Sequence, residues 1–226
     1  MPGIFSLTND NGKLRKQERL PVPDNVNLFN FVFADLDGDG RHEIVAVDDS
    51  FKLRVIQNSS TTWKSDERFG GTKRFIGGEP AMESGKNPMR NELVDAVGER
   101  FKEFYIPSRI LVGDIDRDGV DDIILNRNPD TITTVAPRMM QYPNGTLVGL
   151  KWNGIGLEEM WRTRKIDGYV INYQVKSLAM GSENITDDEL FIGLMLNTGS
   201  YNPFSSDQAT VVIYPFDFEM PEPESN

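Results

Sequence analysis

The sequence contains no cysteine and only one histidine, His42. The lack of cysteine excludes disulfide bridges, thiol redox chemistry and zinc sites with thiolate ligands. A Ser-His-Asp or Cys-His catalytic site needs a histidine base, and His42 is part of a short, strongly acidic segment instead. We therefore predict no catalytic residue of these nucleophilic types.

Long apolar segments are also missing. No stretch approaches the roughly 18 consecutive apolar residues that a helix needs to cross a bilayer. The first 25 residues contain neither the basic region nor the apolar region of a signal peptide. We expect no membrane span and no signal or anchor in this chain.

Positive charge is scarce. The chain of 226 residues has 24 Lys and Arg against 35 Asp and Glu, which gives a formal net charge of −11. Such a protein repels phosphate backbones and anionic lipid, and no GxGxxG or GxxxxGK[ST] phosphate loop occurs. We predict no nucleic-acid partner. The hydrophobic content of 38% suits a globular fold with its own core.

An internal repeat organises the chain. Residues 33–47 (FADLDGDGRHEIVAV) align without a gap with residues 112–126 (VGDIDRDGVDDIILN). A weaker third copy begins at Val175 and resumes at Asp188, after a longer loop. Repeats of about 40 to 60 residues, longer where a loop is inserted, are typical of β-propeller blades with four strands each.

β-Branched and alternating apolar segments surround each copy and predict strands. The expected strands are 29–33, 43–47, 51–56 and 61–64 around the first copy; 109–112, 122–125, 147–152 and 157–162 around the second; and 171–175, 190–196 and 210–216 around the third. Segments 4–7 and 14–20 predict an N-terminal hairpin, and Pro143-Asn-Gly145 predicts a turn.

One segment, 87–105, departs from the strand pattern. Pro88 can begin a helix, and the apolar residues that follow recur at helical spacing. They are Leu93, Val94, Val97, Phe101 and Phe104. We predict a short amphipathic helix in an insertion. Its apolar stripe either packs on the surface of the domain or serves a partner or a central channel.

Both full copies of the repeat place carboxylates at alternate positions of a tight turn. Calcium prefers six to eight oxygen ligands, and residues spaced in this way can converge on one ion while glycine relieves the bend. Four carboxylates within nine residues would otherwise repel one another. The predicted ligands are Asp35, Asp37, Asp39, Arg41 (through its carbonyl) and Glu43 in the first loop, and Asp114, Asp116, Asp118, Val120 (through its carbonyl) and Asp122 in the second.

An EF-hand opens with the same acidic pattern but differs afterwards. Its loop needs a glutamate at position 12 and a helix on each side. Position 12 is Ala46 in the first loop and Leu125 in the second, and the apolar runs 44–47 and 123–125 favour strands. An EF-hand is therefore excluded.

The motif Asp-x-Asp-x-Asp-Gly-x-x-Asp/Glu followed by Ile-Val or Ile-Ile resembles the FG-GAP, or VCBS, repeats of integrin α-subunit propellers and of many bacterial surface and secreted proteins. The resemblance is strong at 35–47 and 114–125. It implies blades of a seven-bladed type of propeller in which calcium has a structural role. The third copy has Ser177, Ala179 and Gly181 in place of the aspartates, so we expect that loop to bind no metal.

We therefore predict an all-β chain of three to three and a half four-stranded antiparallel propeller blades with one short inserted helix. The predicted single domain, 1–226, divides into the end of a preceding blade (1–20), a blade with a calcium loop (27–70), an insertion with the helix (71–107), a second blade with a calcium loop (108–166), a degenerate blade (167–218) and a tail (219–226). Because propellers usually have four to eight blades, we expect further blades or a partner protein to complete the ring.

The predicted function is a non-enzymatic binding or scaffolding module with two calcium ions and a protein or glycan partner. Calcium loops of extracellular proteins bind at about 0.1–1 mM, a concentration met outside the cytosol, so we predict an extracytoplasmic location: secreted, periplasmic or cell surface. The alternative is a carbohydrate-binding or carbohydrate-active protein with a cleft lined by Trp152 and Trp161. Packing between blades is the other role for these residues and for Trp63.

Overall fold

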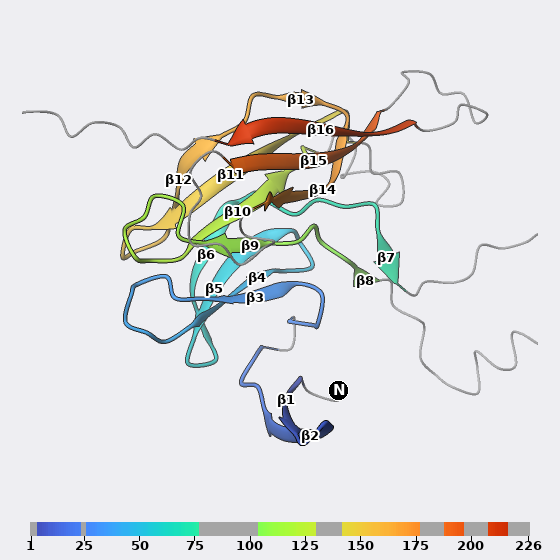
Figure 1. Cartoon of the computed structure of the whole chain (residues 1–226). Helices are drawn as coiled ribbons and strands as arrows, with labels where there is room; N and C mark the ends of the chain where they lie inside the picture. The colour runs from blue at the N-terminus through green and yellow to red at the C-terminus, as the bar shows by residue number, and fades with distance from the viewer. Residues whose placement is uncertain are drawn as a thin grey trace, which may run out of the picture.

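The structure is a computed structural model, and it describes residues 4–23, 26–76, 104–129, 142–176, 188–196 and 208–216. In these ranges the protein is all-β, with antiparallel sheets of two to five strands (Figure 1). Among the described residues, no helix has the length and apolar character needed to cross a membrane.

Three larger sheets follow one another along the chain, and the strands of each lie side by side in chain order. The first sheet contains β3 (Phe31–Ala34), β4 (Glu43–Val47), β5 (Lys52–Gln57) and β6 (Ser60–Arg68). The second contains β9 (Leu111–Gly113), β10 (Asp122–Arg127), β11 (Asn144–Trp152) and β12 (Leu157–Arg162), with β13 (Ile166–Asp167) also paired to β11. The third contains β14 (Tyr169–Val175), β15 (Asp188–Leu196) and β16 (Gln208–Phe216).

The two full copies of the repeat form strands in the same register. In the first sheet, Ala34 pairs with Glu43 where the loop meets β4. In the second sheet, Gly113 pairs with Asp122 at the aligned position of β10. The gapless alignment of the sequence is therefore also an alignment of strand pairs, which places both acidic loops at the same point of their sheets.

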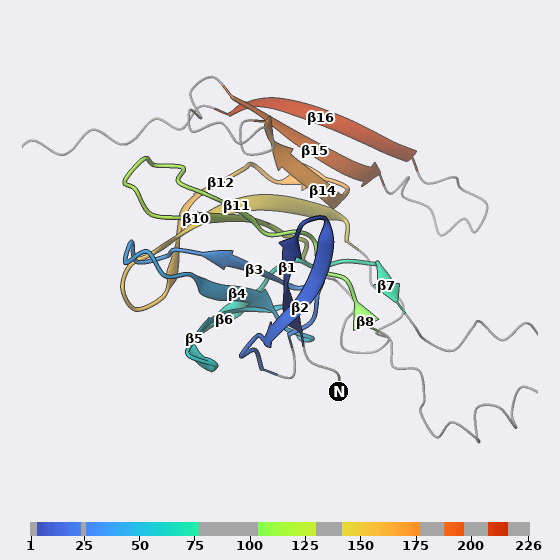
Figure 2. The same ribbon diagram turned by 60° about the horizontal axis from the view of Figure 1, so that its bottom comes forward.

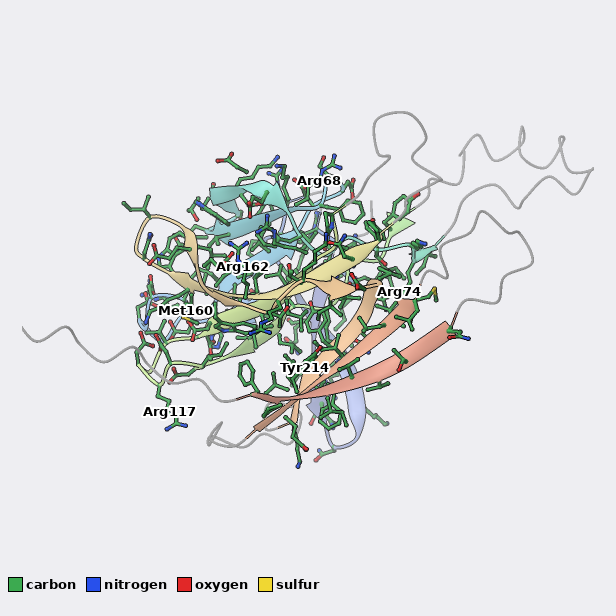
Figure 3. The ribbon with its side chains drawn as sticks, turned by 90° about the horizontal axis from the view of Figure 1, so that it is seen from above. Arg68, Arg74, Arg117, Met160, Arg162 and Tyr214 are labelled. Carbon is green, nitrogen blue, oxygen red and sulfur yellow. The ribbon has the colours of Figure 1, made fainter. Side chains whose placement is uncertain are left out.

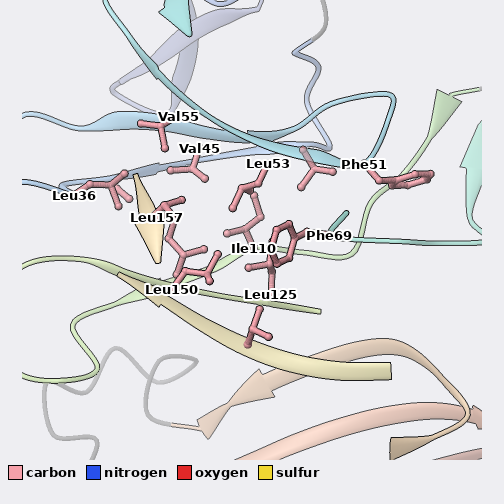
Figure 4. Packing of buried hydrophobic residues seen from close by; sticks show 14 residues of the cluster. Leu36, Val45, Phe51, Leu53, Val55, Phe69, Ile110, Leu125, Leu150 and Leu157 are labelled. Atoms are coloured by element: carbon pink, nitrogen blue, oxygen red, sulfur yellow. The ribbon is translucent and has the colours of Figure 1, made fainter. Parts of the chain in front are cut away.

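The three sheets stack face to face in chain order (Figures 1 and 2). Apolar side chains of β4, β5, β10 and β11 fill the space between the first and second sheets, and Figure 4 shows this cluster. A second cluster joins the second and third sheets. Its largest buried members include Tyr173, Leu147, Ile124 and Leu190.

Central strands covered on both faces explain the continuous apolar runs in the sequence. All five residues of β4 are buried. Val45 and Val47 face the second sheet, whereas Ile44 and Ala46 belong to a cluster on the opposite face of the first sheet. β10 is buried in the same way, because the second sheet lies between the other two.

Two small sheets complete the described structure. The N-terminal hairpin consists of β1 (Phe5–Asp10) and β2 (Lys13–Arg19). Its turn, Asn11-Gly12, has positive φ at both residues, as expected for a two-residue hairpin turn. The other small sheet pairs β7 (Phe75–Ile76) with β8 (Phe104–Tyr105).

The structure confirms the all-β prediction, and a strand lies at each predicted strand segment. The helix prediction is wrong for Phe104 and Tyr105, because their backbone pairs with β7; residues 87–103 lie outside the described residues. The predicted turn at Asn144-Gly145 is instead the start of β11, since these two residues pair with β13.

The predicted propeller needs a closed ring of blades, and the described sheets form no closed ring. The three larger sheets span residues 31–68, 111–167 and 169–216. The third loop, with its predicted lack of metal, and the tail 219–226 lie outside the described residues.

Candidate metal sites in two acidic loops

Each acidic loop connects the first two strands of its sheet. The first loop runs from Asp35 to His42, between β3 and β4, and the second runs from Asp114 to Asp121, between β9 and β10. Because the strand pairs on either side are in the same register, the two loops leave and re-enter their sheets at matching positions.

The structure brings carboxylates of both loops together. In the first loop, side-chain oxygens of Asp35, Asp37 and Asp39 lie within 4.8 Å of one another. In the second, the same is true of Asp114, Asp116 and Asp122. Each group could hold a metal ion. Asp35 is part-buried, whereas Asp37 and Asp39 are exposed and line a cavity of about 350 Å³.

The first aspartate of each loop holds the turn in shape. The carboxylate of Asp35 accepts hydrogen bonds from the backbone N–H of Gly38 at 2.9 Å and of Gly40 at 3.0 Å. The carboxylate of Asp114 accepts a matching bond from Gly119 at 2.9 Å. Gly40 and Gly119 both have positive φ, 80° and 89°, a conformation that glycine adopts without steric cost.

The ninth residue of each acidic motif, counted from Asp35 or Asp114, is Glu43 or Asp122, and its carboxylate accepts a hydrogen bond from the loop backbone. Glu43 Oε2 accepts the N–H of Leu36 at 3.0 Å, and Asp122 Oδ2 accepts the N–H of Ile115 at 2.9 Å. Both acidic residues are buried. In the first loop the second oxygen of Glu43 also has a partner, since Gln57 Nε2 donates to Oε1 at 3.2 Å.

Asp122 differs from Glu43 because its second oxygen, Oδ1, is buried and has no hydrogen-bond partner among the described residues. A buried oxygen of this kind costs free energy unless a donor or a cation satisfies it. Burial raises the pKa of Asp122 to about 7, and the negative charge of Asp116 contributes in the same direction. The environment of Asp122 therefore fits a bound cation.

A positively charged side chain already approaches the second loop. Lys151 Nζ lies 2.5 Å from Asp116 Oδ2 and 2.6 Å from Asp118 Oδ2. These hydrogen bonds raise the pKa of Lys151. Burial by itself raises the pKa of Asp118, but the hydrogen bonds from Lys151 and from the N–H of Val120, together with the positive charge of Lys151, outweigh it, so the net shift is downward. The ammonium group of Lys151 lies where a metal ion would contact Asp116 and Asp118, which shows that these carboxylates attract positive charge.

The first loop has no lysine at the matching place. In the first sheet Ile44 pairs with Ile56, and in the second sheet Ile123 pairs with Leu150. The residue after Ile56 is Gln57, whereas the residue after Leu150 is Lys151. The two loops therefore share their backbone and differ in the charge that the neighbouring strand supplies.

The other predicted ligands lie in the loops or, for Glu43, at the first residue of β4, and all are outside the two carboxylate groups. These are Glu43 and Asp118, and Arg41 and Val120, which were predicted through their carbonyls. The N–H of Arg41 donates to Asp39 Oδ1 at 2.7 Å, and that of Val120 donates to Asp118 Oδ1 at 2.9 Å. Arg41 and Val120 therefore occupy equivalent places in the two turns.

The two loops also contact each other. Asp121 Oδ2 accepts the N–H of Asp35 at 2.8 Å, and the N–H of Asp121 donates to the carbonyl oxygen of Asp35 at 3.0 Å. This two-bond contact joins the first candidate ligand of one loop to the other loop. Sequence reasoning missed Asp121 and Lys151, and knowledge of strand pairing would have been needed to find them.

Two comparisons with known proteins gave no match: no family model matches this sequence, and no curated protein matches it. The two acidic loops are therefore interpreted from their own residues, register and hydrogen bonds.

Proposed function

We propose that this chain is a calcium-stabilised binding or scaffolding module built from FG-GAP/VCBS-type β-propeller blades. The observation that carries the proposal is the equivalence of the two acidic loops. They share the order of their carboxylates and the register of the flanking strands. They also share one hydrogen bond, from the N–H of Leu36 to buried Glu43 in the first loop and from the N–H of Ile115 to buried Asp122 in the second.

Calcium is the ion that these donors suit best. All candidate ligands are oxygens, and calcium takes six to eight oxygens in a flexible geometry, whereas magnesium requires a stricter octahedron and keeps several waters. Asp35, Asp37 and Asp39 would hold the first ion, and Asp114, Asp116 and Asp122 the second. When bound, calcium would neutralise the loop carboxylates and fasten the first two strands of each sheet.

The stacked sheets support the interpretation as propeller blades. Each larger sheet is an antiparallel meander, and successive meanders pack face to face, as neighbouring blades do. On the third sheet, Val211 and Ile213 of β16 are 65% and 53% exposed. We expect a further blade or a partner protein to cover this apolar surface.

The positions of the tryptophans favour a packing role over a role in stacking against sugar rings. Trp63 and Trp152 pack against the core between the first and second sheets, and Trp161 packs against the next core. The Trp161 ring meets Phe216 edge to face, with ring centroids 5.3 Å apart. Side chains used in this way do not form a platform for a sugar ring, so the non-enzymatic proposal is preferred.

Calcium dependence also supports an extracytoplasmic location. Loops of this exposed kind bind calcium at about 0.1–1 mM in extracellular modules. The proposed location is therefore secreted, periplasmic or cell surface. A calcium dissociation constant near 1 µM for both loops would instead fit a cytosolic sensor and would contradict this part of the proposal.

A thermal melt with and without chelator tests the proposed function. Binding to the native state alone stabilises it by mass action, by about 2.7 kcal/mol for one site when free calcium is 100 times the dissociation constant. We expect two calcium ions per chain and a melting temperature several degrees lower in EDTA. Asp35→Asn and Asp114→Asn should each remove one ion, with Asp66→Asn on the exposed end of β6 as a control. An unchanged melting temperature in EDTA would overturn the proposal.

A further inference from the structure

A cavity of about 550 Å³ opens between the first and second sheets, at the ends of the strands opposite to the acidic loops. Its volume is in the range of small-molecule sites. Four of its lining residues are cationic: Arg68, Arg127, Arg162 and Lys165. We call this cavity the basic pocket. It is separate from the candidate metal ligands, none of which lines it.

The basic side chains converge from different elements. Arg68 ends β6 of the first sheet, Arg127 ends β10, and Arg162 ends β12 of the second sheet. Lys165 lies directly before β13. Figure 3 shows Arg68 and Arg162 on neighbouring sheets. Among the described residues, Glu67 is the one acidic residue that lines the same cavity, although the whole chain has a net charge of −11.

Two of the four cations are already paired. Arg127 Nη2 lies 2.7 Å from Glu67 Oε1, and its guanidinium lies over the ring of Phe69, 5.7 Å from the centroid. Arg162 pairs with Glu159, three residues away on the same strand. These contacts hold both guanidinium groups at the rim of the pocket.

Arg68 and Lys165 make no side-chain hydrogen bond or ion pair with any described residue. Both are exposed to solvent. Two cations without counter-charges therefore face a cavity in a protein that is otherwise strongly acidic. Concave surfaces lined by one sign of charge concentrate ions of the opposite sign, so this pocket attracts an anion.

Two uncharged residues of the lining, Tyr142 and Asn128, are held by contacts within the fold. Tyr142 is buried, stacks on Tyr169 with centroids 5.1 Å apart, and donates to the carbonyl oxygen of Thr72 at 3.3 Å. The amide of buried Asn128 donates to the carbonyl oxygen of Gly71 at 2.9 Å. These contacts fix two lining side chains before a ligand binds, which lowers the entropic cost of binding.

We propose that the basic pocket binds a small ligand that carries a carboxylate group, either an acidic sugar or a simple organic acid. A guanidinium presents two parallel N–H donors that match the two oxygens of a carboxylate. Arg68 supplies this fork, and Lys165 supplies a second charge for the same anion. The proposal goes beyond the calcium-dependent scaffold and does not depend on metal in the acidic loops.

Titration of the full chain with glucuronate, succinate, glucose and inorganic phosphate, followed by calorimetry and by amide NMR shifts, tests the proposal. We expect glucuronate or succinate to bind and to shift resonances of Arg68, Thr146 and Lys165, while glucose does not bind. The tighter of the two acids identifies the ligand as an acidic sugar or as a simple organic acid. Low salt is required, because salt screens exposed charges.

The double variant Arg68→Gln/Lys165→Gln should weaken binding of the preferred acid at least tenfold. The matched control Lys13→Gln/Arg19→Gln removes the same two charges from the N-terminal hairpin and should leave binding unchanged. Failure of both acids to bind, phosphate binding as tightly as either acid, or an equal loss in the control variant would each overturn the proposal. Resonance shifts in the unmodified protein keep the test valid if a variant folds poorly.

Discussion

Lys151 is the residue that distinguishes the two acidic loops. Its ammonium group contacts Asp116 and Asp118, both predicted ligands, so it occupies oxygens that a metal ion would need. Gln57, at the matching place beside the first loop, carries no charge. The same loop sequence is therefore expected to bind calcium with different strength at the two sites.

The substitution Lys151→Gln should make the second site resemble the first. We expect its affinity for calcium to rise about tenfold, a change of about 1.4 kcal/mol in binding free energy, because the ion no longer displaces an ammonium group. Calorimetric titration of both sites is the measurement, with Lys13→Gln as a control. An affinity that stays the same or falls would show that Lys151 does not compete with the ion.

Arg117 carries backbone strain in the second loop. Its φ is 62°, and the aligned residue of the first loop, Gly38, has a φ of 72°. A residue with a side chain pays about 1 kcal/mol or more in this left-handed region. Arg117→Gly should therefore raise the melting temperature by about 2–4 °C. Arg117→Ala removes the same charge but keeps the strain, and it should give no such increase; equal gains from both variants would rule out the strain explanation.

At the scale of elements, Asp48 stabilises the turn between β4 and β5. Its side chain is 4% exposed, accepts the N–H groups of Ser50 at 2.8 Å and Lys52 at 2.9 Å, and pairs with Arg54 at 2.7 Å. Burial by itself raises the pKa of Asp48, but the hydrogen bonds from Lys52, Arg54 and Ser50 outweigh it and lower the pKa below its usual value of 3.8.

A lowered folded-state pKa means that ionised Asp48 stabilises the fold. This contribution is fully present above pH 4 and is lost as pH falls through the folded-state pKa. Asp48→Asn should lower the free energy of unfolding at pH 7 by about 2 kcal/mol, and the difference from the unmodified protein should shrink at pH 3. Urea unfolding at both pH values checks this, and a difference that grows in acid would refute it.

Close contact between the paired strands β11 and β12 depends on glycine at Gly149. A Cβ added there would lie 2.0 Å from Nε1 of Trp161, a side chain held by Phe216 of the third sheet. Gly149→Ala should therefore destabilise the protein by about 1–3 kcal/mol through overpacking. The matched variant is Gly193→Ala in β15, where the nearest atom lies at 3.6 Å. Equal destabilisation by both variants would contradict the packing argument.

Local sequence signals were sufficient for most strands and for both loops. β4 and β10 were predictable because an apolar run begins four residues after each glycine, at Ile44 and at Ile123, and the loop carboxylates because their spacing is local. Features that depend on contacts between residues far apart in the sequence could not be predicted. Phe104 fits a helical apolar stripe, but its backbone pairs with Ile76, and Lys151 approaches Asp116 from a strand 35 residues further along the chain.

At the scale of the whole molecule, the acidic loops link the first sheet to the second. The contact between Asp35 and Asp121 couples the loops directly, whereas the third sheet is joined to the second through an apolar core and through hydrogen bonds such as that from Asn128 to the carbonyl oxygen of Val170. Loss of calcium should therefore loosen the first two sheets more than the third.

Hydrogen exchange measured with and without EDTA tests this coupling. Amides of β4 and β10 should exchange faster when calcium is removed, because local opening no longer has to release the ion. Amides of β14 and β15 should change little. A uniform increase along all strands would indicate global destabilisation instead of a local link between the loops.

The most direct test of the central claim is a crystal structure determined in millimolar calcium, with anomalous diffraction used to identify the ions. The account predicts two anomalous peaks. One should lie 2.3–2.6 Å from oxygens of Asp35, Asp37 and Asp39, and the other at the same range from Asp114 and Asp116, with Lys151 moved away. Loops without either peak, and with Lys151 still bound to Asp116, would contradict it.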